Sequence, residues 1–356
     1  MGDMLIHITA ADAIQVIVLG FIGGVLSGFI GSGGAFFMTP GMMNLGVQGV
    51  IAVGSNITHK FGKALVGSKK HGELGHVDKK LGIFMLITAL IGIRLAVWIS
   101  TSLFGISDTH GDKGAAANLY ISAVFVIILA GVALSMLLDL LKSRKASEAG
   151  PSRRITEYLS KLRLFPMIHF PVADVSVSLW ALLIVGLFTG YLAGTIGVGG
   201  FVGVPAMIYV FGVPTAVAAG TELFLAMFMG AFGAINYAYE GFVDIRLVLL
   251  MYLGSLLGIF IGAYGTKVVN EVVIRLVTCI IIILCVVSRA IAIPIYMGQL
   301  EMVDFVPPSS YDTLNEISKY FLYVSGIGGV LVILVQVVRA YIKRRRVLAT
   351  IATKSE

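Results

Sequence analysis

Residues 20–34 read GFIGGVLSGFIGSGG, and residues 186–200 read GLFTGYLAGTIGVGG. The two stretches share glycines at six equivalent positions, 166 residues apart throughout, and both lie within long apolar segments. Further matches follow at the same spacing, among them the pattern Gly-x-Val-Asp at 75–78 and at 241–244. An internal repeat of glycine-broken apolar segments is typical of membrane transporters.

The composition is that of an integral membrane protein. Hydrophobic residues make up 58% of the chain and charged residues only 13%, whereas soluble domains carry about 25% charged residues. No β-barrel alternation is present, so we expect an all-α, polytopic fold. The first apolar stretch has no basic segment before it and is not interpreted as a cleaved signal peptide. Nine stretches approach the ~20 residues that a helix needs to cross hydrocarbon: 12–32, 49–68, 81–103, 118–141, 177–197, 213–236, 246–265, 272–293 and 319–341.

Basic residues gather at two places, the loop at 142–163 and the tail after Arg339. Such clusters flank membrane helices on the cytoplasmic side, so both are expected there, and nucleic acid is not an expected partner. Nine simple crossings would put loop and tail on opposite sides. The conflict disappears if the chain doubles back at Gly31–Gly34 and again at Gly197–Gly200. Each repeat then makes an odd number of passes, so the sequence predicts inverted repeats and a cytoplasmic C-terminus.

The predicted organisation therefore has two transmembrane repeats and one additional helix. Its parts are repeat 1 at 12–141, a basic cytoplasmic linker at 142–176, repeat 2 at 177–293, a polar extracytoplasmic segment at 294–318, an extra helix at 319–341 and a basic tail at 342–356.

The six glycines of each stretch suggest two different roles. The first three are spaced by four, which allows close packing between helices. The last three are too dense for packing alone and predict a break in the helix. The N–H groups of broken helices attract anions, and matching breaks in two halves indicate a central substrate site. A nucleotide phosphate loop is the weaker alternative, because no Lys-Ser/Thr follows either turn. The predicted substrate-binding glycines are Gly31, Gly33, Gly34, Gly197, Gly199 and Gly200.

A polar stripe is expected on the helix at 49–68. Asn56, His59 or Lys60, and Lys63 recur at helical spacing and share one face, with Ser55 beside them. Ionisable residues within a membrane are costly and mark functional sites, so the stripe is a candidate wall for an anion. For Lys63 the favoured interpretation is that its side chain reaches the membrane interface, and for Lys60 this alternative has the same weight as a contact with the anion. His59 is either a protonation switch or a hydrogen-bonded buried histidine.

In the second repeat Thr221 and Glu222 take the places of Ser55 and Asn56, and Ser55 and Thr221 are both predicted to bind substrate. Glu222 lies far from either helix end and requires a proton or a partner, which makes it the candidate for proton coupling; a structural hydrogen bond is the alternative. Arg94 is expected either to pair with Glu222 or to line the pathway.

The remaining polar residues of the apolar stretches carry weaker signals. Asn236 and Asp139 are minor candidates near helix ends, and Arg275 and Arg289 are expected to anchor their helix at the membrane interfaces. The sequence indicates no metal and no cofactor. Cys279 and Cys285, six positions apart, are expected to be packing residues.

The string GFIGSGG at 28–34, followed by Pro40, resembles the signature of the TauE/SafE family, and GTIGVGG at 194–200, followed by Pro205, resembles it again. The pairs Gly54-Ser55 and Gly220-Thr221 and the two Gly-x-Val-Asp patterns are similar to its later motifs. The resemblance covers about 12–293. It implies a multi-pass exporter of sulfite, sulfoacetate or related sulfur-containing anions in the bacterial inner membrane, driven by the proton gradient. The long basic join at 142–176 and the helix after 319 depart from that pattern.

The sequence thus predicts a secondary transporter that exports a small anion by alternating access of two repeats, with protons and the lipid bilayer as its other partners. An anion channel, or a transporter of another anionic metabolite, is the alternative. A membrane enzyme ranks last, because no catalytic constellation of acids, Ser/His/Asp or Cys/His is present.

Overall fold

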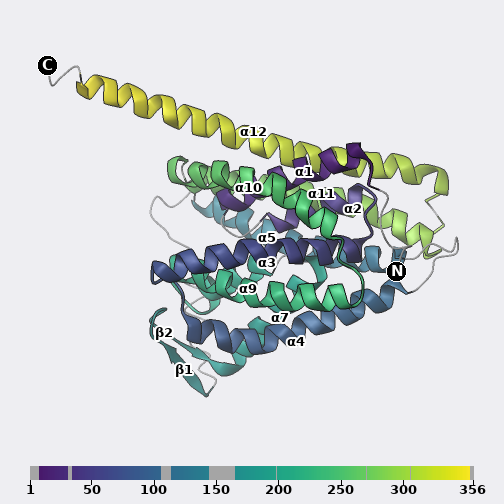
Figure 1. Cartoon of the computed structure of the whole chain (residues 1–356), viewed down its shortest axis with the longest axis horizontal. Coiled ribbons are helices and arrows are strands. Elements are labelled where there is room, and N and C mark those ends of the chain that lie inside the picture. Colours follow the sequence, from purple (N-terminus) through teal and green to yellow (C-terminus); the bar gives the residue numbers. More distant parts are fainter. Residues whose placement is uncertain are drawn as a thin grey trace.

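The protein is a set of long helices that lie alongside one another, seen in a computed structural model (Figure 1). The structure describes residues 8–30, 34–105, 114–143, 165–197, 199–269, 271–304 and 306–352. The elements of the first half are α1 (Ala10–Ile30), α2 (Ala35–Asn44), α3 (Gly49–Glu73), α4 (Lys79–Phe104), α5 (Ala115–Ser143) and the strands β1 (Met167–Phe170) and β2 (Val175–Ser178). Those of the second half are α7 (Leu179–Ile196), α8 (Gly200–Pro205), the π-helical turn η2 (Ala206–Val210), α9 (Thr215–Tyr239), α10 (Ile245–Val268), α11 (Glu271–Gln299), the 3-10 turn η3 (Pro308–Ser310) and α12 (Tyr311–Ala352).

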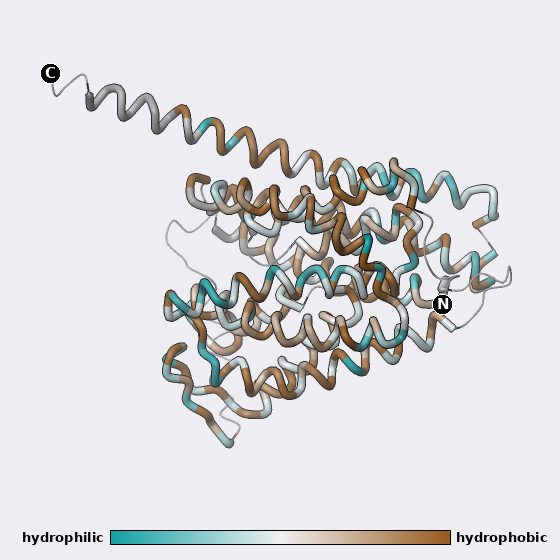
Figure 2. The backbone as a smooth tube through the Cα atoms, in the orientation of Figure 1, coloured by the Kyte–Doolittle hydropathy of each residue, from teal (hydrophilic) through white to brown (hydrophobic). Residues whose placement is uncertain are grey.

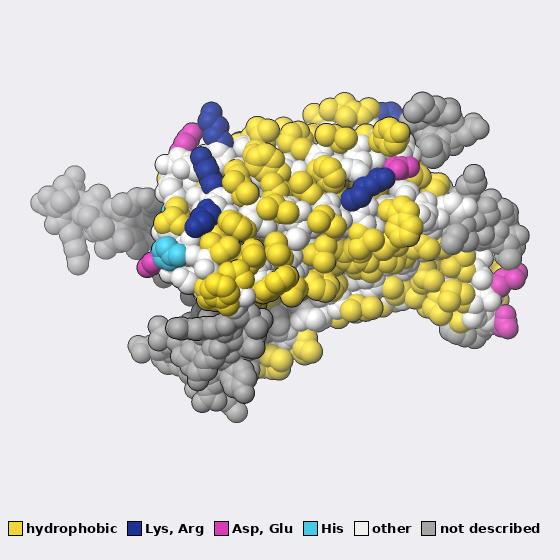
Figure 3. Space-filling model, turned by 90° about the horizontal axis from the view of Figure 1, so that it is seen from below, with side chains coloured by type: hydrophobic (Ala, Val, Ile, Leu, Met, Phe, Trp, Pro, Cys, Tyr) yellow, Lys and Arg dark blue, Asp and Glu magenta, His cyan; other side chains and the backbone are white. Residues whose placement is uncertain are grey.

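Eight helices in the described ranges are long and apolar enough to cross a membrane. The polytopic helical fold predicted from the sequence is therefore confirmed. The helix α3 is also 25 residues long, but its lysines and histidines make it more polar than its neighbours, as the hydrophilic turns along it in Figure 2 show. Figure 3 shows the apolar band expected of a lipid-facing surface, with Lys and Arg side chains gathered mainly toward one end.

The chain reverses direction after α1, as predicted. A Cβ added at Gly41 in α2 would meet Leu19, and one added at Gly34 would meet the backbone of Gly23, so α2 runs antiparallel to α1. With ten residues, α2 is about 15 Å long, roughly half the thickness of the hydrocarbon core. In the second repeat α7 ends at Gly197, whose φ of 77° is left-handed and favours glycine.

The first three glycines of each repeated stretch pack helices closely, which confirms the packing role predicted for them. They are Gly20, Gly24 and Gly28 in the first half and Gly186, Gly190 and Gly194 in the second. A Cβ at Gly20 would lie 2.6 Å from the backbone oxygen of Met251, and one at Gly24 would lie 2.5 Å from that of Ser255. These contacts bring α1 of the first half against α10 of the second half. The same contacts recur 166 residues later, where Gly186 and Gly190 of α7 pack on the backbone of α4. The two halves therefore interlock, since the first helix of each packs on the other.

The helices α3 and α9 occupy equivalent places in the two halves and pack directly on each other. Cβ atoms built at Gly230 and Gly233 of α9 would meet Phe61 and Ile57 of α3, and one built at Gly67 of α3 would meet Leu223. As the residue numbers increase along α3, the numbers of the α9 residues that they contact therefore decrease. The two equivalent helices are antiparallel, and the cavity described below lies between them.

Three features differ from what the sequence suggested. The predicted linker contains an antiparallel hairpin of β1 and β2. The helix α12 begins at Tyr311 and has 42 residues, so it extends on both sides of the predicted 319–341, and it projects beyond the other helices in Figure 1. The side chain of Arg289 is only 1% exposed, so it reaches neither lipid headgroups nor water and cannot anchor its helix as expected.

Candidate functional site

A small polar cavity lies between α3 and α9. It is close to α2 and α8, the short helices that follow the two glycine-rich stretches and are called the return helices below. Its volume is about 60 Å³, several times the ~10–15 Å³ that one water requires. Ala35 of α2 and Gly200 of α8 both border it, so the two glycine-broken segments meet at this point. The full lining is Ser27, Ala35, Asn56, His59, Lys60, Lys63, Ala64, Gly200, Val204, Ala219, Glu222, Leu223 and Ala226.

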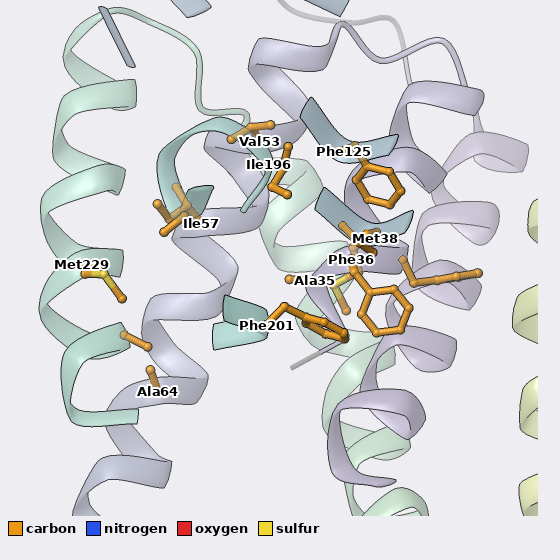
Figure 4. Packing of buried hydrophobic residues seen from close by; sticks show 14 of the residues in the cluster. Ala35, Phe36, Met38, Val53, Ile57, Ala64, Phe125, Ile196, Phe201 and Met229 are labelled. Carbon is orange, nitrogen blue, oxygen red and sulfur yellow. The ribbon is translucent and has the colours of Figure 1, made fainter. Parts of the chain in front are cut away.

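The two return helices also contact each other beside the cavity. Phe36 of α2 packs edge-on against Phe201 of α8, with ring centroids 4.8 Å apart and an interplanar angle of 64°. Figure 4 shows this pair next to Ala35. The aromatic contact holds the two helices together next to Ala35 and Gly200, whereas the charged groups of the cavity lie on α3 and α9.

The predicted polar stripe of α3 lines the cavity. Asn56, His59, Lys60 and Lys63 all border it, at the spacing that places them on one helix face. His59 is fully buried, and its Nε2 lies 2.8 Å from Oγ of Ser255 on α10. Lys60 and Lys63 are half-buried, and in the described part of the chain neither forms an ion pair with a carboxylate. The stripe therefore presents two cations to a confined polar space.

Glu222 of α9 faces these cations from the other side of the cavity. Its side chain is 5% exposed, and within the described ranges neither carboxylate oxygen has a hydrogen-bond partner. A Coulomb interaction links it to Lys60, although the two are not in direct ion-pair contact. A buried carboxylate without a hydrogen bond is costly, and the cost falls when the group binds a proton or a ligand.

Asn56 stands 166 residues before Glu222 and differs from it in bonding. Its Nδ2 donates to the backbone oxygen of Ala35 at 3.1 Å and to Oγ1 of Thr39 at 2.8 Å. Thr39 in turn donates to the backbone oxygen of Ile196 at 3.1 Å. Asn56 therefore ties α2 to α3 and, through Thr39, to the end of α7. Asn56 lines the cavity, and its buried Oδ1 atom has no hydrogen-bond partner among the described residues.

The two return segments, α2 in the first half and α8 with η2 in the second, differ in how deeply they are buried. All ten residues of α2 are buried. The equivalent segment is divided into the six residues of α8 and the five of η2, and only Gly200, Phe201, Gly203 and Met207 are buried within it. Short π-helical turns often occur at functional positions. The second segment is therefore the more loosely held of the two.

Ser55 and Thr221 do not line the cavity but join the two halves. The backbone N–H of Asp78 donates to Oγ1 of Thr221 at 3.0 Å, and that of Asp244 donates to Oγ of Ser55 at 3.1 Å. These bonds form a reciprocal pair at equivalent positions. The substrate contact predicted for both hydroxyls is not what the structure shows, because neither residue lines the cavity.

The two aspartates of this reciprocal pair are held differently. Asp78 Oδ2 accepts the backbone N–H groups of Val172 and Ala173 in the β-hairpin, both at 3.1 Å. Asp244 instead accepts from the side chain of Arg246 at 2.7 Å. Burial opposes ionisation of Asp244, but the hydrogen bonds from Arg246 outweigh it, so the pKa of Asp244 lies below its ordinary value.

Arg94 lies away from the cavity on the outer surface of α4. Its Nη1 donates to Oδ1 of Asn236 at 3.1 Å and lies 3.8 Å from a carboxylate oxygen of Glu240. The side chain is 54% exposed. Neither expectation for Arg94, pairing with Glu222 or lining the pathway, agrees with this placement.

The predicted glycines divide into three groups. Gly31 and Gly33 lie outside the residues that the structure describes. Gly34 packs on Gly23, and Gly199 on Ala193, without bordering the cavity. Gly200 does border it, and a Cβ at Gly197 would lie 3.0 Å from Nδ2 of Asn56.

Sequence reasoning missed several groups that complete the site. Ser27 lines the cavity, Thr39 holds Asn56, and Ser255 holds His59. Ser27 and Thr39 carried a weak signal as polar residues within the glycine-rich segments; Ser255 carried none, because its partner is 196 residues away. Among the described residues no group of three or more His, Cys, Asp or Glu is arranged to hold a metal ion.

The fold and the cavity define a class of polytopic helical membrane proteins in which two interlocked halves enclose a central polar site, the arrangement of secondary transporters. Comparison with known proteins identifies the family. The model described as "Sulfite exporter TauE/SafE" matches residues 16–289, and the chain belongs to this family. The relatives below are named as probable membrane transporter proteins.

Three curated relatives illustrate the similarity. The "Probable membrane transporter protein YjnA" of Bacillus subtilis (strain 168) is 26% identical over 253 residues, which is 71% of this chain and 89% of the relative. YdhB of the same organism is 24% identical over 267 residues, covering 73% and 93% of the two chains. A "Probable membrane transporter protein" of Xylella fastidiosa (strain 9a5c) is 26% identical over 264 residues, covering 72% and 85%. No solved structure shows a significant match.

Proposed function

We propose that the protein is a secondary transporter that exports a small sulfur-containing anion, such as sulfite or an organosulfonate, out of the bacterial cytoplasm. The single observation that carries this proposal is the cavity between α3 and α9, in which Lys60 and Lys63 face a confined space and form no ion pair with any carboxylate that the structure describes. Family membership supports the substrate class. An oxyanion would lie between these cations and the glycine-broken start of α8 at Gly200.

Coupling to protons is proposed through the difference between Asn56 and Glu222. An ionised carboxylate only accepts hydrogen bonds, whereas a protonated one also donates. Protonated Glu222 would then donate to α8 as Asn56 donates to α2, and α8 packs against it at Gly203. The charged or titratable groups that face Glu222 are Lys60, Lys63 and His59 of α3; the described part of α8 contributes none. Binding of a proton would thereby hold the looser return segment in place.

We propose that the two repeats are inverted relative to the membrane and alternate in access to the cavity. The proposal is supported by the reciprocal contacts of α1 with α10 and α7 with α4, and by the antiparallel packing of α3 on α9. A two-fold axis that relates two antiparallel helices is perpendicular to them, and so lies in the membrane plane. With the basic linker and tail in the cytoplasm, the loop between α3 and α4 is cytoplasmic and α12 ends there.

Flux measurements in liposomes test the proposal. Purified protein is reconstituted, and efflux of sulfite, sulfate, thiosulfate and a sulfonate is followed with and without a pH gradient. Saturable flux of one of these anions that a pH gradient drives uphill is the expected result. Unsaturable downhill flux that ignores the gradient would favour the anion channel. Absence of flux for all sulfur anions, with transport of another anionic metabolite, would overturn the substrate class.

A further inference from the structure

A second group of polar side chains is buried where α2, α11 and α12 meet. It lies at the far end of α2 from the cavity, since Ala35 begins this helix and Asn44 ends it. Nδ2 of Asn44 donates to Oγ of Ser288 on α11 at 3.2 Å, and Oγ of Ser318 on α12 lies 3.2 Å from Oδ1 of Asn44. Ten helical residues separate this group from the cavity by about 15 Å.

Arg289 adds a positive charge to this group. Its side chain is 1% exposed, and its Nη2 donates to Oγ of Ser318 at 3.3 Å. Its Nε and Nη1 atoms are buried and have no hydrogen-bond partner. No carboxylate in the described part of the chain forms an ion pair with it. Two of its three guanidinium nitrogens therefore have unused donors.

A buried arginine without a carboxylate partner requires another source of negative charge. The guanidinium group stays protonated in proteins, so it cannot escape the cost of burial by losing its proton. An uncompensated charge inside a membrane protein is costly, and such groups normally face a partner. The C-terminal end of α2 supplies only a partial negative charge. The hydroxyl groups of Ser288 and Ser318 are neutral.

We propose that Arg289 forms, where Asn44, Ser288 and Ser318 meet, a second anion site, separate from the transport cavity, that takes a small inorganic anion. The free guanidinium N–H groups provide charge-assisted donors. The hydroxyls of Ser288 and Ser318 donate to the backbone oxygens of Ser318 and Ser288, both at 2.8 Å, and so hold α11 and α12 together beside the site. Ser318 belongs to α12, which lies beyond the residues that match the family. A bound anion would therefore hold α12 on α2 and α11. The proposal does not depend on the protein being an anion transporter.

Thermal unfolding of the purified full-length protein tests the site. The midpoint is measured in sodium chloride, sodium sulfate and sodium gluconate at equal ionic strength, so that a halide and a tetrahedral oxyanion are compared with a large organic anion. A saturable rise in the midpoint with chloride or sulfate is expected for the wild type. Arg289→Gln should lose this rise. Arg94→Gln, which removes an arginine on the outer surface, should keep it.

Two further variants separate this site from the cavity and from simple misfolding. Lys60→Gln alters the cavity and should keep the anion-dependent rise. Arg289→Lys retains the charge without the planar fork, and the anion concentration at half-maximal shift should increase. An equal rise in Arg289→Gln and wild type, or no rise in the wild type, overturns the proposal. Loss of the rise in Lys60→Gln but not in Arg289→Gln would assign the anion to the cavity, leaving the proposed function intact and this site refuted.

Discussion

Asn56 and Glu222 occupy equivalent positions on α3 and α9, yet the amide nitrogen of Asn56 makes two hydrogen bonds to α2 while the carboxylate of Glu222 makes none. The same difference appears in the segments that they face, because α2 is buried throughout and the segment of α8 and η2 is not. An amide has permanent donors, but a carboxyl group has one only when protonated. Asn56 can therefore donate its hydrogen bonds to α2 at any pH, whereas Glu222 can donate one only when its carboxyl group is protonated.

The first prediction concerns Glu222→Gln. The amide mimics the protonated acid and cannot titrate, so anion flux should lose its dependence on the pH gradient while the protein remains folded. Efflux from liposomes with and without the gradient measures this, and size-exclusion elution reports folding. Glu240→Gln, near the end of the same helix, is the matched control and should behave as the wild type. Unchanged proton-coupled flux in Glu222→Gln would remove this residue from the mechanism.

Lys60→Gln tests the cationic wall of the cavity. Loss of a charge-assisted contact to a bound oxyanion should cost about 1.5–3 kcal/mol, which corresponds to roughly tenfold or more in the KM for the anion. Concentration-dependent efflux gives this value. Lys79→Gln serves as the comparison, because Lys79 is exposed at the start of α4. Equal KM values in the two variants would show that Lys60 does not contact the substrate.

Asn56→Ala should destabilise the protein. The substitution leaves the backbone oxygen of Ala35 and the hydroxyl of Thr39 without their donor inside the protein, at a cost of about 1–3 kcal/mol. The free energy of unfolding in denaturant measures the change. Thr39→Val also breaks two hydrogen bonds, those with Asn56 and with the backbone oxygen of Ile196, and should cost about as much. An unchanged free energy of unfolding in Asn56→Ala would contradict the structural role given to Asn56.

Gly24→Ala and Gly190→Ala test the interlocked packing. A Cβ at Gly24 would lie 2.5 Å from the backbone oxygen of Ser255, so α1 and α10 must separate, at a cost of about 1–3 kcal/mol. Gly190 meets Ala89 in the same way. Gly131→Ala is the control: nothing lies within 4 Å of its added Cβ, and alanine favours a helix by about 0.5–1 kcal/mol. Thermal unfolding should separate the first two variants from the third.

The pH dependence of stability should include a contribution from Asp244. Its folded pKa is lowered by the hydrogen bonds of Arg246, which prevail over burial, from the ordinary value of 3.8. The stabilisation is therefore complete above pH 3.8 and disappears as pH falls through the lowered folded pKa. Unfolding of wild type and Asp244→Asn, compared between neutral and acidic pH, should show a difference that shrinks only under acid conditions. A difference that is constant with pH would assign the stabilisation to packing.

The helical membrane fold could be predicted from the sequence because its signals are local. Apolar length specifies a spanning helix, glycines at spacing four specify close packing, and both are read within one segment. The polar stripe of Asn56, His59, Lys60 and Lys63 was recognisable for the same reason, since one helix face contains all four residues. The family signature at 28–34 and 194–200 was likewise contained in short strings.

The partners of these residues depended on the tertiary structure. Ser55 and Thr221 were predicted to bind substrate, but they accept N–H groups from Asp244 and Asp78 in the opposite half. Arg94 faces outward to Asn236, and Arg289 faces inward without a carboxylate partner in the described part of the chain. Sequence spacing determines which side chains share a helix face. Which face meets another helix, and therefore which polar group is satisfied and which is left for a ligand, is decided only when the two halves interlock.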